Sequence, residues 1–521
     1  MLKYSRLLRT LKPLITDRAF VRPLGEGPAA EAALDLIMET VSVLDYDCDY
    51  LPGAEFSKVV NDSRQTDCDS VFVAIPGTVA DGHQFIPLAL TAGTQVIISE
   101  RSAAAELVPG SVNLIVSNSS LAYAMLCDAA WDDPAAAMSG IAVTGTNGKT
   151  TTAMLIRALL SQARQTCGLI STVEYDTGNG QIIPADRTTP EAARLFELFA
   201  QMRKHQLQYF VMEVSSHALH QHRIGTLKFR AAIFTNLTGD HLDYHHNMEE
   251  YYQAKRKLFT EHLAPNGVAV INCDDRYGLR LSQETAHNRP ITFGRSSGVW
   301  RIEDIDLQRS GSSFVLNNGH IRQKIQSNLH GLHNVYNLTG TVLALDALSI
   351  LPLAESAQIL QQTAIAVPGR LEAITLANGA TAFVDYAHTH DALSNVLQTL
   401  RALNFRRIIT VFGAGGDRDR SKRPLMGQAA AELSDVIVLT SDNPRSENPG
   451  DIISEIRAGI PDSYPELYLE EDRKQAIIMA IKMAAAGDAI LIAGKGHENY
   501  QIIHDRTLHL DDREIVREFQ A

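Results

Sequence analysis

The stretch Ile141-Ala-Val-Thr-Gly145-Thr-Asn-Gly148-Lys149-Thr150-Thr151 decides the fold of the middle of this chain. A short apolar strand runs into glycines, and a lysine followed by hydroxyl side chains then opens a helix. Glycines let backbone N–H groups close on phosphate oxygens, and the helix N-terminus adds the positive end of its dipole. The lysine can reach terminal phosphates and a threonine hydroxyl can bind Mg²⁺. The stretch predicts a nucleotide site formed by Gly145, Thr146, Asn147, Gly148, Lys149, Thr150 and Thr151.

The spacing is a shorter variant of the usual phosphate loop, because Val143 stands where G-x4-G-K-T requires a glycine. The alternative is a glycine-rich turn without a ligand, which the flanking strand and helix patterns disfavour. A second glycine run, Phe412–Gly416, also follows a predicted strand. It lacks G-x-G-x-x-G and is followed by the charged segment GDRDRSKRP, so we reject dinucleotide binding there.

Outward from this loop, apolar strands alternate with helical patterns, which is typical of α/β proteins with parallel sheets. The length of 521 residues exceeds one ordinary core, and we expect three domains, covering 1–136, 137–367 and 368–521. Ligands bind at the carboxyl ends of strands in such open sheets. The predicted strands are VFVAI and QVIIS in the first domain; SGIAVTG, YFVMEVSS, AAIFTNL and VAVINCD in the second, with a polar strand-rich section at 291–328; and TAFVDYA, RIITVFG, DVIVLTS and DAILIAG in the third, each expected to lead through a loop into a helix.

Composition argues against a nucleic-acid-binding, membrane-spanning or disulfide-rich protein. The formal charge of −13 provides no global basic field for nucleic acid or an anionic membrane, so phosphate binding must be local. The five cysteines, at 48, 68, 127, 167 and 273, form no C-x-x-C pair, which argues against disulfides and structural zinc. The basic opening, residues 1–20, reads as a helix, and no apolar stretch approaches the roughly 20 residues that span a bilayer. We expect a cytoplasmic protein without membrane insertion.

Six motifs occur in order along the chain and resemble the Mur ligase family. They are TGTNGKTT (144–151), MEVSSHAL (212–219), TNLTGDHLDYH (235–245), GLHNVYN (331–337), PGRLE (368–372) and VDYAHTHDAL (384–393). The family implies an N-terminal domain for a UDP-sugar, a central P-loop ATPase-type domain with a parallel-rich sheet, and a C-terminal Rossmann-like domain for an amino acid. Further motifs are similar to the subgroup that adds the third residue of the stem peptide: NDSR (61–64), VFVAIPG (71–77), DGHQFI (81–86), GGDRDRSKRPLMG, SDNPRSENP and GKGHE.

The resemblance implies an ATP-dependent amide-bond ligase of peptidoglycan biosynthesis. Such an enzyme adds meso-diaminopimelate to UDP-N-acetylmuramoyl-L-alanyl-D-glutamate through an acyl phosphate, with ATP as cosubstrate and Mg²⁺ as cofactor. The implied partners are these small molecules, without nucleic acid, and we expect a monomer. Transfer of a phosphoryl group depends on charge neutralisation more than on covalent catalysis. The residues that match catalytic positions are Lys149, Glu213, His241 and Lys255, and those that match metal positions are Thr150, Glu213, His241 and Lys255, the last if it is carbamylated.

The resemblance also assigns binding residues. Nucleotide contacts beyond the phosphate loop fall on Asn334, Arg370 and Asp385, and His388 follows in the same loop. His390 stands where the family usually has proline, which puts the shape of this loop in doubt. Residues that match UDP-substrate positions are Ser63, Thr78, Val79, Ala80, Thr188, Thr189, Ser215, Gln221 and Arg223. Residues that match diaminopimelate positions are Arg418, Asp442, Asn443, Pro444, Arg445, Gly494 and Glu498.

Arg445 carries the prediction of the amino-acid substrate. Meso-diaminopimelate has a second carboxylate that lysine lacks, and a planar guanidinium can hold a carboxylate bidentately. Two other readings stay open: a folylpolyglutamate synthetase-like ligase, which should lack the NDSR and DNPR motifs, and a P-loop protein that uses ATP as a switch. The unusual first 55 residues also leave room for a paralogue with a changed substrate.

Overall fold

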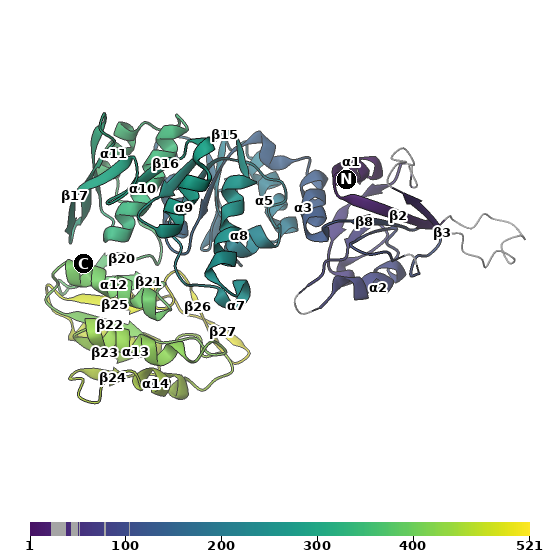
Figure 1. Ribbon diagram of the computed structural model, residues 1–521. Helices are drawn as coiled ribbons and strands as arrows, with labels where there is room; N and C mark the ends of the chain where they lie inside the picture. The colour runs from purple at the N-terminus through teal and green to yellow at the C-terminus, as the bar shows by residue number, and fades with distance from the viewer. Residues whose placement is uncertain (22–37, 43–50, 52, 78–79, 104) are drawn as a thin grey trace, which may run out of the picture. The chain divides into compact units, whose positions relative to one another are not determined.

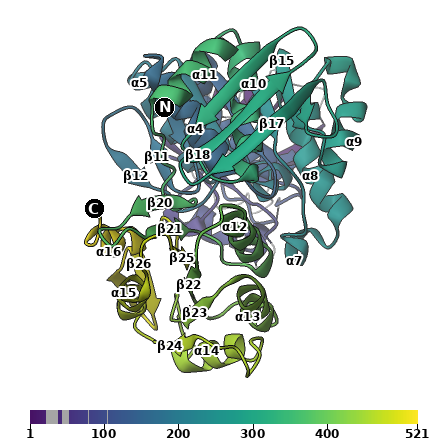
Figure 2. The same cartoon turned by 90° about the vertical axis from the view of Figure 1, so that its left-hand side faces the viewer.

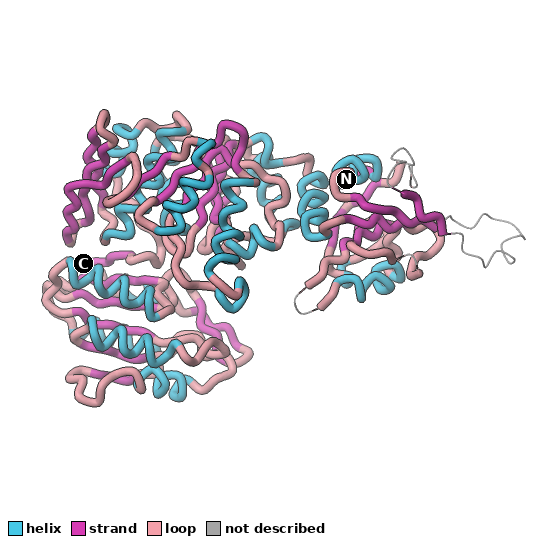
Figure 3. Tube along the Cα trace, viewed as in Figure 1, coloured by secondary structure: helices cyan, strands magenta, loops and turns pink. Residues whose placement is uncertain are grey.

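The computed structural model describes residues 1–21, 38–42, 51, 53–77, 80–103 and 105–521 (Figure 1). The chain forms two compact units by its internal contacts. The first comprises Met1–Asn147, Arg164–Val270 and Arg280–Pro290, and the second Gly148–Ala163, Ile271–Leu279 and Ile291–Ala521. Strands and helices alternate along most of the chain, as the sequence predicts (Figure 3). The predicted domain boundaries at 136/137 and 367/368 stay predictions.

The N-terminal part of the first unit contains a six-stranded sheet in the order β3-β2-β8-β7-β6-β5. Strands β5 to β8 are parallel, as expected, whereas β2 pairs antiparallel with both β3 and β8. The expected N-terminal helix is shorter than predicted, because residues 15–21 form strand β2 instead. The elements are β1 (Leu2–Lys3), α1 (Tyr4–Leu11), β2 (Ile15–Val21), β3 (Met38–Ser42), β4 (Glu55–Phe56), β5 (Lys58–Val60), β6 (Ser70–Val73), α2 (Ile86–Thr91), β7 (Val96–Ser99), β8 (Val112–Val116) and α3 (Ser119–Ala130).

The remainder of the first unit has parallel strands β10, β13, β9 and β14 side by side. Their side chains are almost all buried, as continuous apolar runs predict for a sheet covered on both faces. The elements are β9 (Ser139–Thr144), β10 (Cys167–Ile170), β11 (Glu174–Asp176), β12 (Ile182–Pro184), α5 (Ala192–Lys204), β13 (Tyr209–Glu213), α6 (Ser216–His220), β14 (Phe229–Phe234), α7 (Leu242–His245), α8 (Met248–Thr260) and β15 (Leu263–Asn272), the last two residues of which belong to the second unit.

The second unit begins with helix α4 (Lys149–Gln162) and includes a meander of polar strands that matches the predicted strand-rich section. Strands β17, β18 and β19 pair antiparallel there. Helix α9 (Arg276–Glu284) is shared between the two units. The further elements of this part are β16 (Ile291–Gly294), β17 (Trp300–Gln308), β18 (Gly311–Asn317), β19 (Arg322–Ser327), α10 (Leu332–Ala347) and α11 (Leu353–Gln362).

The C-terminal part of the second unit contains a sheet in the order β20-β21-β25-β22-β23-β24, parallel except for β20. Helices α12, α13 and α14 lie on one face, and α15 and α16 on the other (Figure 2). The elements are β20 (Glu372–Thr375), β21 (Thr381–Asp385), α12 (His390–Ala402), β22 (Ile408–Phe412), α13 (Lys422–Leu433), β23 (Val436–Leu439), α14 (Pro449–Arg457), β24 (Leu467–Leu469), α15 (Arg473–Met483), β25 (Ala489–Ala493), β26 (Tyr500–Ile503), β27 (Arg506–His509) and α16 (Asp512–Arg517).

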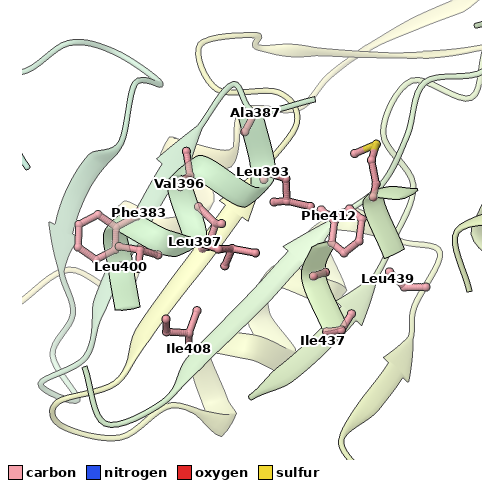
Figure 4. Packing of buried hydrophobic residues seen from close by; sticks show 14 of the residues in the cluster. Phe383, Ala387, Leu393, Val396, Leu397, Leu400, Ile408, Phe412, Ile437 and Leu439 are labelled. Carbon is pink, nitrogen blue, oxygen red and sulfur yellow. The ribbon is translucent and has the colours of Figure 1, made fainter. Parts of the chain in front are cut away.

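The core of this sheet holds the loops at its carboxyl edge in place. Leu393 and Leu397 of α12 pack toward Phe383, Ile408 and Phe412 of the strands, all fully buried (Figure 4). One expectation for this region is wrong. Strand β25 does not lead through a loop into a helix, because the hairpin β26–β27 comes between it and α16.

No helix among the described residues has the length and apolar composition needed to cross a membrane. Cys68, Cys127, Cys167 and Cys273 are free thiols, and Cys48 lies outside the described residues.

Candidate active site

The glycines of the phosphate loop are required by close contacts. Gly145 and Gly148 have φ angles of 150° and 86°. A side chain at Gly145 would collide with the hydroxyl of Thr235, and one at Gly148 would collide with the amide of Asn337. Helix α4 begins at Lys149, directly after its N-cap residue Gly148. The loop thus delivers Lys149 and the following threonines to the positive end of a helix dipole.

Residues after strand β14 brace the loop within the first unit. The N–H groups of Thr146 and Asn147 donate to the backbone oxygen and the side-chain oxygen of Asn236, each at 2.9 Å. The hydroxyl of Thr235 donates to the carbonyl of Asn147 at 2.6 Å. These bonds fix the backbone of Thr146 and Asn147.

Lys255 reaches the same loop, which the sequence alone could not show. Its side chain is buried, and Nζ donates to the carbonyl of Gly145 at 2.8 Å and lies 4.8 Å from the ring centre of Tyr251. An ordinary solvated helix lysine would not be placed in this way. Carbamylation of Lys255 stays a prediction.

Glu213 and His241 differ in their surroundings. Glu213, at the end of β13, is fully buried and accepts hydrogen bonds from the N–H and hydroxyl of Thr172 at 2.8 and 3.1 Å. His241 is exposed, has a φ of 55° and directly precedes α7. Among the described residues no three His, Cys, Asp or Glu side chains form a group suited to a metal ion. A carboxylate oxygen such as that of Glu213 suits Mg²⁺ better than an imidazole nitrogen does. Both metal assignments stay predictions.

A cluster of rings around His241 was not predicted. His217 lies edge-on to His241 with ring centres 4.8 Å apart, and His245 stacks on Tyr251 at 5.2 Å. His245 also hydrogen-bonds Ser216 at 2.9 Å. Burial lowers the pKa of His217 and His245 to about 4, so both rings are neutral at neutral pH. The sequence signal that could have indicated this cluster is the high density of histidines in HALHQH and HLDYHH.

Thr189, Ser215 and Arg223, three of the residues predicted to bind the UDP-linked substrate, gather around the end of β13. The hydroxyl of Thr189 donates to the carbonyl of Glu213 at 2.9 Å, and the N–H of Ser215 donates back to Thr189 at 3.0 Å. Arg223 donates to the carbonyl of Thr189 at 3.1 Å. Further contacts of the set join Thr188 to Thr172 at 3.0 Å and Arg223 to Gln221 at 2.6 Å.

The other residues predicted to bind the UDP-linked substrate, Ser63 and Ala80, follow parallel strands of the N-terminal sheet. Ser63 opens a short turn after β5, and Ala80 lies in the exposed loop after β6. Thr78 and Val79 lie outside the described residues. These loops lie at the carboxyl ends of their strands, where ligands are expected.

Within the second unit, residues predicted to bind ATP lie against helix α4. Arg370 Nη2 donates to the hydroxyl of Thr150 at 3.3 Å. Asn334 accepts a hydrogen bond at 3.1 Å from Asn337, which in turn accepts one from Thr152 at 3.4 Å. The structure therefore brings Arg370 and Asn334 to the helix that carries the phosphate-loop lysine.

Asp385 stabilises the turn that carries Arg370. Its buried carboxylate accepts hydrogen bonds from the N–H groups of Leu371 and Ala387 at 2.6 and 2.8 Å. Burial raises the pKa of Asp385, and the nearby Arg370 opposes that rise. His390 is the first residue of helix α12, which Thr389 caps, and proline is also favoured at such a position.

The predicted amino-acid motif lies at the carboxyl ends of β22, β23 and β25. Arg445 Nη1 donates to the carbonyl of Gly416 at 2.7 Å. A Cβ on Gly415 would lie 2.9 Å from Arg445 Nη1 and 3.6 Å from Arg418 Cγ, so the two arginines flank the same glycine. Gly494 packs so closely on Asp442 that a side chain there would meet its carboxylate at 2.5 Å.

Lys495 is a residue of this site that the sequence interpretation missed. It is fully buried, and its Nζ lies 3.2 Å from Glu498 and from the side-chain oxygen of Asn443 and 4.0 Å from Asp442. Asn443 also donates to Glu498 at 3.0 Å. Asn443, Lys495 and Glu498 therefore connect the DNPR segment to the GKGHE segment. The two sequence motifs do not by themselves reveal these contacts.

Comparisons with known proteins identify the family. The model of the Mur ligase middle domain matches residues 143–345, and that of the Mur ligase glutamate ligase domain matches residues 369–496. The chain belongs to the Mur ligase family, and it is therefore a ligase.

Among its relatives are two proteins named UDP-N-acetylmuramoyl-L-alanyl-D-glutamate–2,6-diaminopimelate ligase. The one from Gloeobacter violaceus is 43% identical over 473 residues, 90% of this chain and 94% of the relative. The one from Caldanaerobacter subterraneus is 38% identical over 471 residues, 90% of this chain and 96% of the relative. A solved structure of a ligase with the same name is 34% identical, with a TM-score of 0.64 over 89% of this chain and 94% of that chain.

The fold is shared more widely. A folylpolyglutamate synthase from Mycobacterium tuberculosis, solved with ADP, has a TM-score of 0.58 at 20% identity and covers 73% of this chain and 92% of that chain. At this identity the likeness concerns the fold alone.

Proposed function

We propose that this chain uses ATP to join meso-diaminopimelate to UDP-N-acetylmuramoyl-L-alanyl-D-glutamate in peptidoglycan biosynthesis. The names of relatives at about 40% identity over nine-tenths of the chain support the reaction. The observation that carries the choice of amino acid is that Arg418 and Arg445 both lie close to Gly415, in a site that also holds the carboxylates of the buried Asp442 and the partly buried Glu498. Two guanidinium groups suit two carboxylates, and carboxylates suit an ammonium group.

The chemistry follows from the need for a leaving group. A carboxylate oxygen of the acceptor attacks the γ-phosphorus of ATP, ADP leaves, and an acyl phosphate forms. The amine of the amino acid then attacks the acyl carbon, phosphate leaves with the C–O bond electrons, and the amine loses a proton. Lys149, at the N-terminus of α4, neutralises charge on the transferred phosphoryl group.

Mg²⁺ would neutralise phosphate charge further. Thr150, Glu213 and His241 stay its predicted ligands, together with Lys255 if it is carbamylated. The buried Lys255 at the carbonyl of Gly145 is placed where a changed charge would be felt at the phosphate loop. Intact-mass measurement of active protein would test the modification, because carbamylation adds the mass of one CO₂.

A panel of amino acids tested with ATP and the UDP-linked dipeptide examines the whole proposal. We expect phosphate release only when the dipeptide and meso-diaminopimelate are both present, and little with lysine or glutamate. Release with a folate and glutamate would support the folylpolyglutamate synthetase alternative. Phosphate release that does not depend on either substrate would support a nucleotide switch.

We also propose that the protein is a cytoplasmic monomer. Sedimentation of the purified protein would check the oligomeric state, and fractionation of cells would check the location.

A further inference from the structure

The hairpin β26–β27 lies against the loop that carries Arg445. Arg445 pairs with Ile503 as an isolated parallel bridge. The N–H of Arg445 donates to the carbonyl of Ile502 at 3.1 Å, and the N–H of His504 donates to the carbonyl of Arg445 at 2.7 Å. Both backbone polar groups of Arg445 are therefore bonded to the hairpin.

This bonding maintains an unusual backbone conformation. Arg445 has a φ of 52°, in the left-handed region that residues with a side chain seldom adopt. Such conformations persist where surrounding contacts hold them, and they concentrate at ligand sites. The conformation directs the guanidinium to the carbonyl of Gly416, 2.7 Å from Nη1. The direction of the Arg445 side chain thus depends on a segment that lies outside the amino-acid motifs.

Gln501 connects the hairpin to the start of the same loop. Gln501 is 7% exposed, and its Nε2 donates to the carbonyl of Asp442 at 2.7 Å. Next to it, the N–H of Ile502 donates to the side-chain oxygen of Asn443 at 2.9 Å. The outer strand β27 is exposed at every residue and pairs with β26. Only one strand of the hairpin therefore faces the loop.

We propose that the hairpin β26–β27 is a specificity element of the amino-acid site, with Gln501 as its principal positioning residue. It holds the Asp442–Arg445 loop so that the guanidinium meets the second carboxylate of a diamino dicarboxylic acid. This inference rests on the proposed function. It assigns selection of the substrate to a side chain that need not touch the substrate.

The test compares Gln501→Met, which keeps the length of the side chain but lacks the N–H donor, with Thr507→Ala on the exposed strand β27. Losing a buried hydrogen bond and leaving the Asp442 carbonyl unpaired should raise the KM for meso-diaminopimelate at least about fivefold. The KM values for ATP and the UDP-linked dipeptide should stay within about twofold. The preference for meso-diaminopimelate over lysine should fall, and Thr507→Ala should resemble the wild type.

Gln501→Glu provides a second variant, because its carboxylate oxygen would face the Asp442 carbonyl and should raise the same KM. Wild-type KM values in both Gln501 variants would overturn the inference. So would a parallel rise in the KM values for all three substrates with a lower thermal midpoint, which indicates general loosening. If the wild type does not use meso-diaminopimelate, the proposed function fails. Assays of the wild type alone show this, so that failure is distinguished from failure of the inference on Gln501.

Discussion

The loops after β9 and after β22 are both rich in glycine, but different groups pack against their glycines. After β9, the glycines allow Thr235 and Asn337 to approach, and helix α4 begins immediately at Lys149. After β22, Gly413 and Gly416 allow the carbonyls of Thr440 and Pro444 to approach, and helix α13 begins only at Lys422.

We infer from this difference that such a loop can serve two kinds of recognition. In the first loop a helix N-terminus and a lysine lie together, which suits a phosphate. In the second loop the backbone packs against the Asp442–Arg445 loop, with Gly416 N–H bonded to the carbonyl of Asn443 at 2.9 Å. We therefore expect side chains, Arg418 and Arg445 among them, to provide recognition there rather than backbone amides.

The largest effect should come from Lys149→Ala. We expect ligation to fall by at least about a hundredfold, because the lysine neutralises charge on the transferred phosphoryl group. The fold should persist, since Lys149 opens a helix and is only partly buried. Phosphate release and the thermal midpoint measure the two effects, and near-normal turnover would contradict the phosphate-site assignment.

Glu213→Gln and His241→Ala should change the metal requirement. We expect the Mg²⁺ concentration for half-maximal turnover to rise at least about tenfold, with partial rescue at high Mg²⁺. Gln is chosen at position 213 because it keeps an acceptor for Thr172 in the buried site. If a Mg²⁺ titration is unchanged in both variants, neither residue is a ligand.

Arg445→Ala tests the second loop in the same way that Lys149→Ala tests the first. Loss of a charge-assisted bidentate contact should raise the KM for meso-diaminopimelate at least about tenfold, with ATP affinity little changed. Initial rates with varied amino acid and ATP measure both constants. A variant that keeps its preference for diaminopimelate over lysine would refute the role of Arg445.

The smallest effects separate packing from recognition within the second loop. Gly416→Ala would collide with the backbone carbonyl of Pro444 and should cost about 1–3 kcal/mol of unfolding free energy. Gly415→Ala meets chiefly the tip of Arg445, at 2.9 Å, which can move. We expect Gly415→Ala to raise the KM for meso-diaminopimelate a few-fold with little change in stability. Denaturant unfolding and initial rates compare the two variants, and equal losses of stability would contradict this distinction.

Local patterns predicted most of the strands and helices correctly. The apolar runs that became β9, β13, β14, β21, β22, β23 and β25 are strong signals, because buried parallel strands carry little polar interruption. Strand β2 was mistaken for a continuation of the N-terminal helix, since ITDRAFV combines polar and apolar residues and its pairing with β8 is distant in the sequence. The hairpin β26–β27 was missed because a helix follows the other predicted strands of that domain.

Sequence by itself determined the class of this protein, because the phosphate loop and the spaced motifs each require particular residue types over short distances. It also determined the candidate residues Lys149, Glu213 and Arg445. Tertiary structure decided what holds them: Lys255 at the carbonyl of Gly145, Lys495 between Asn443 and Glu498, and Gln501 on the carbonyl of Asp442. The bonds of Lys255 and Gln501 join residues 110 and 59 positions apart. Contacts over such separations depend on how the sheets and loops pack, so no local pattern of side chains encodes them.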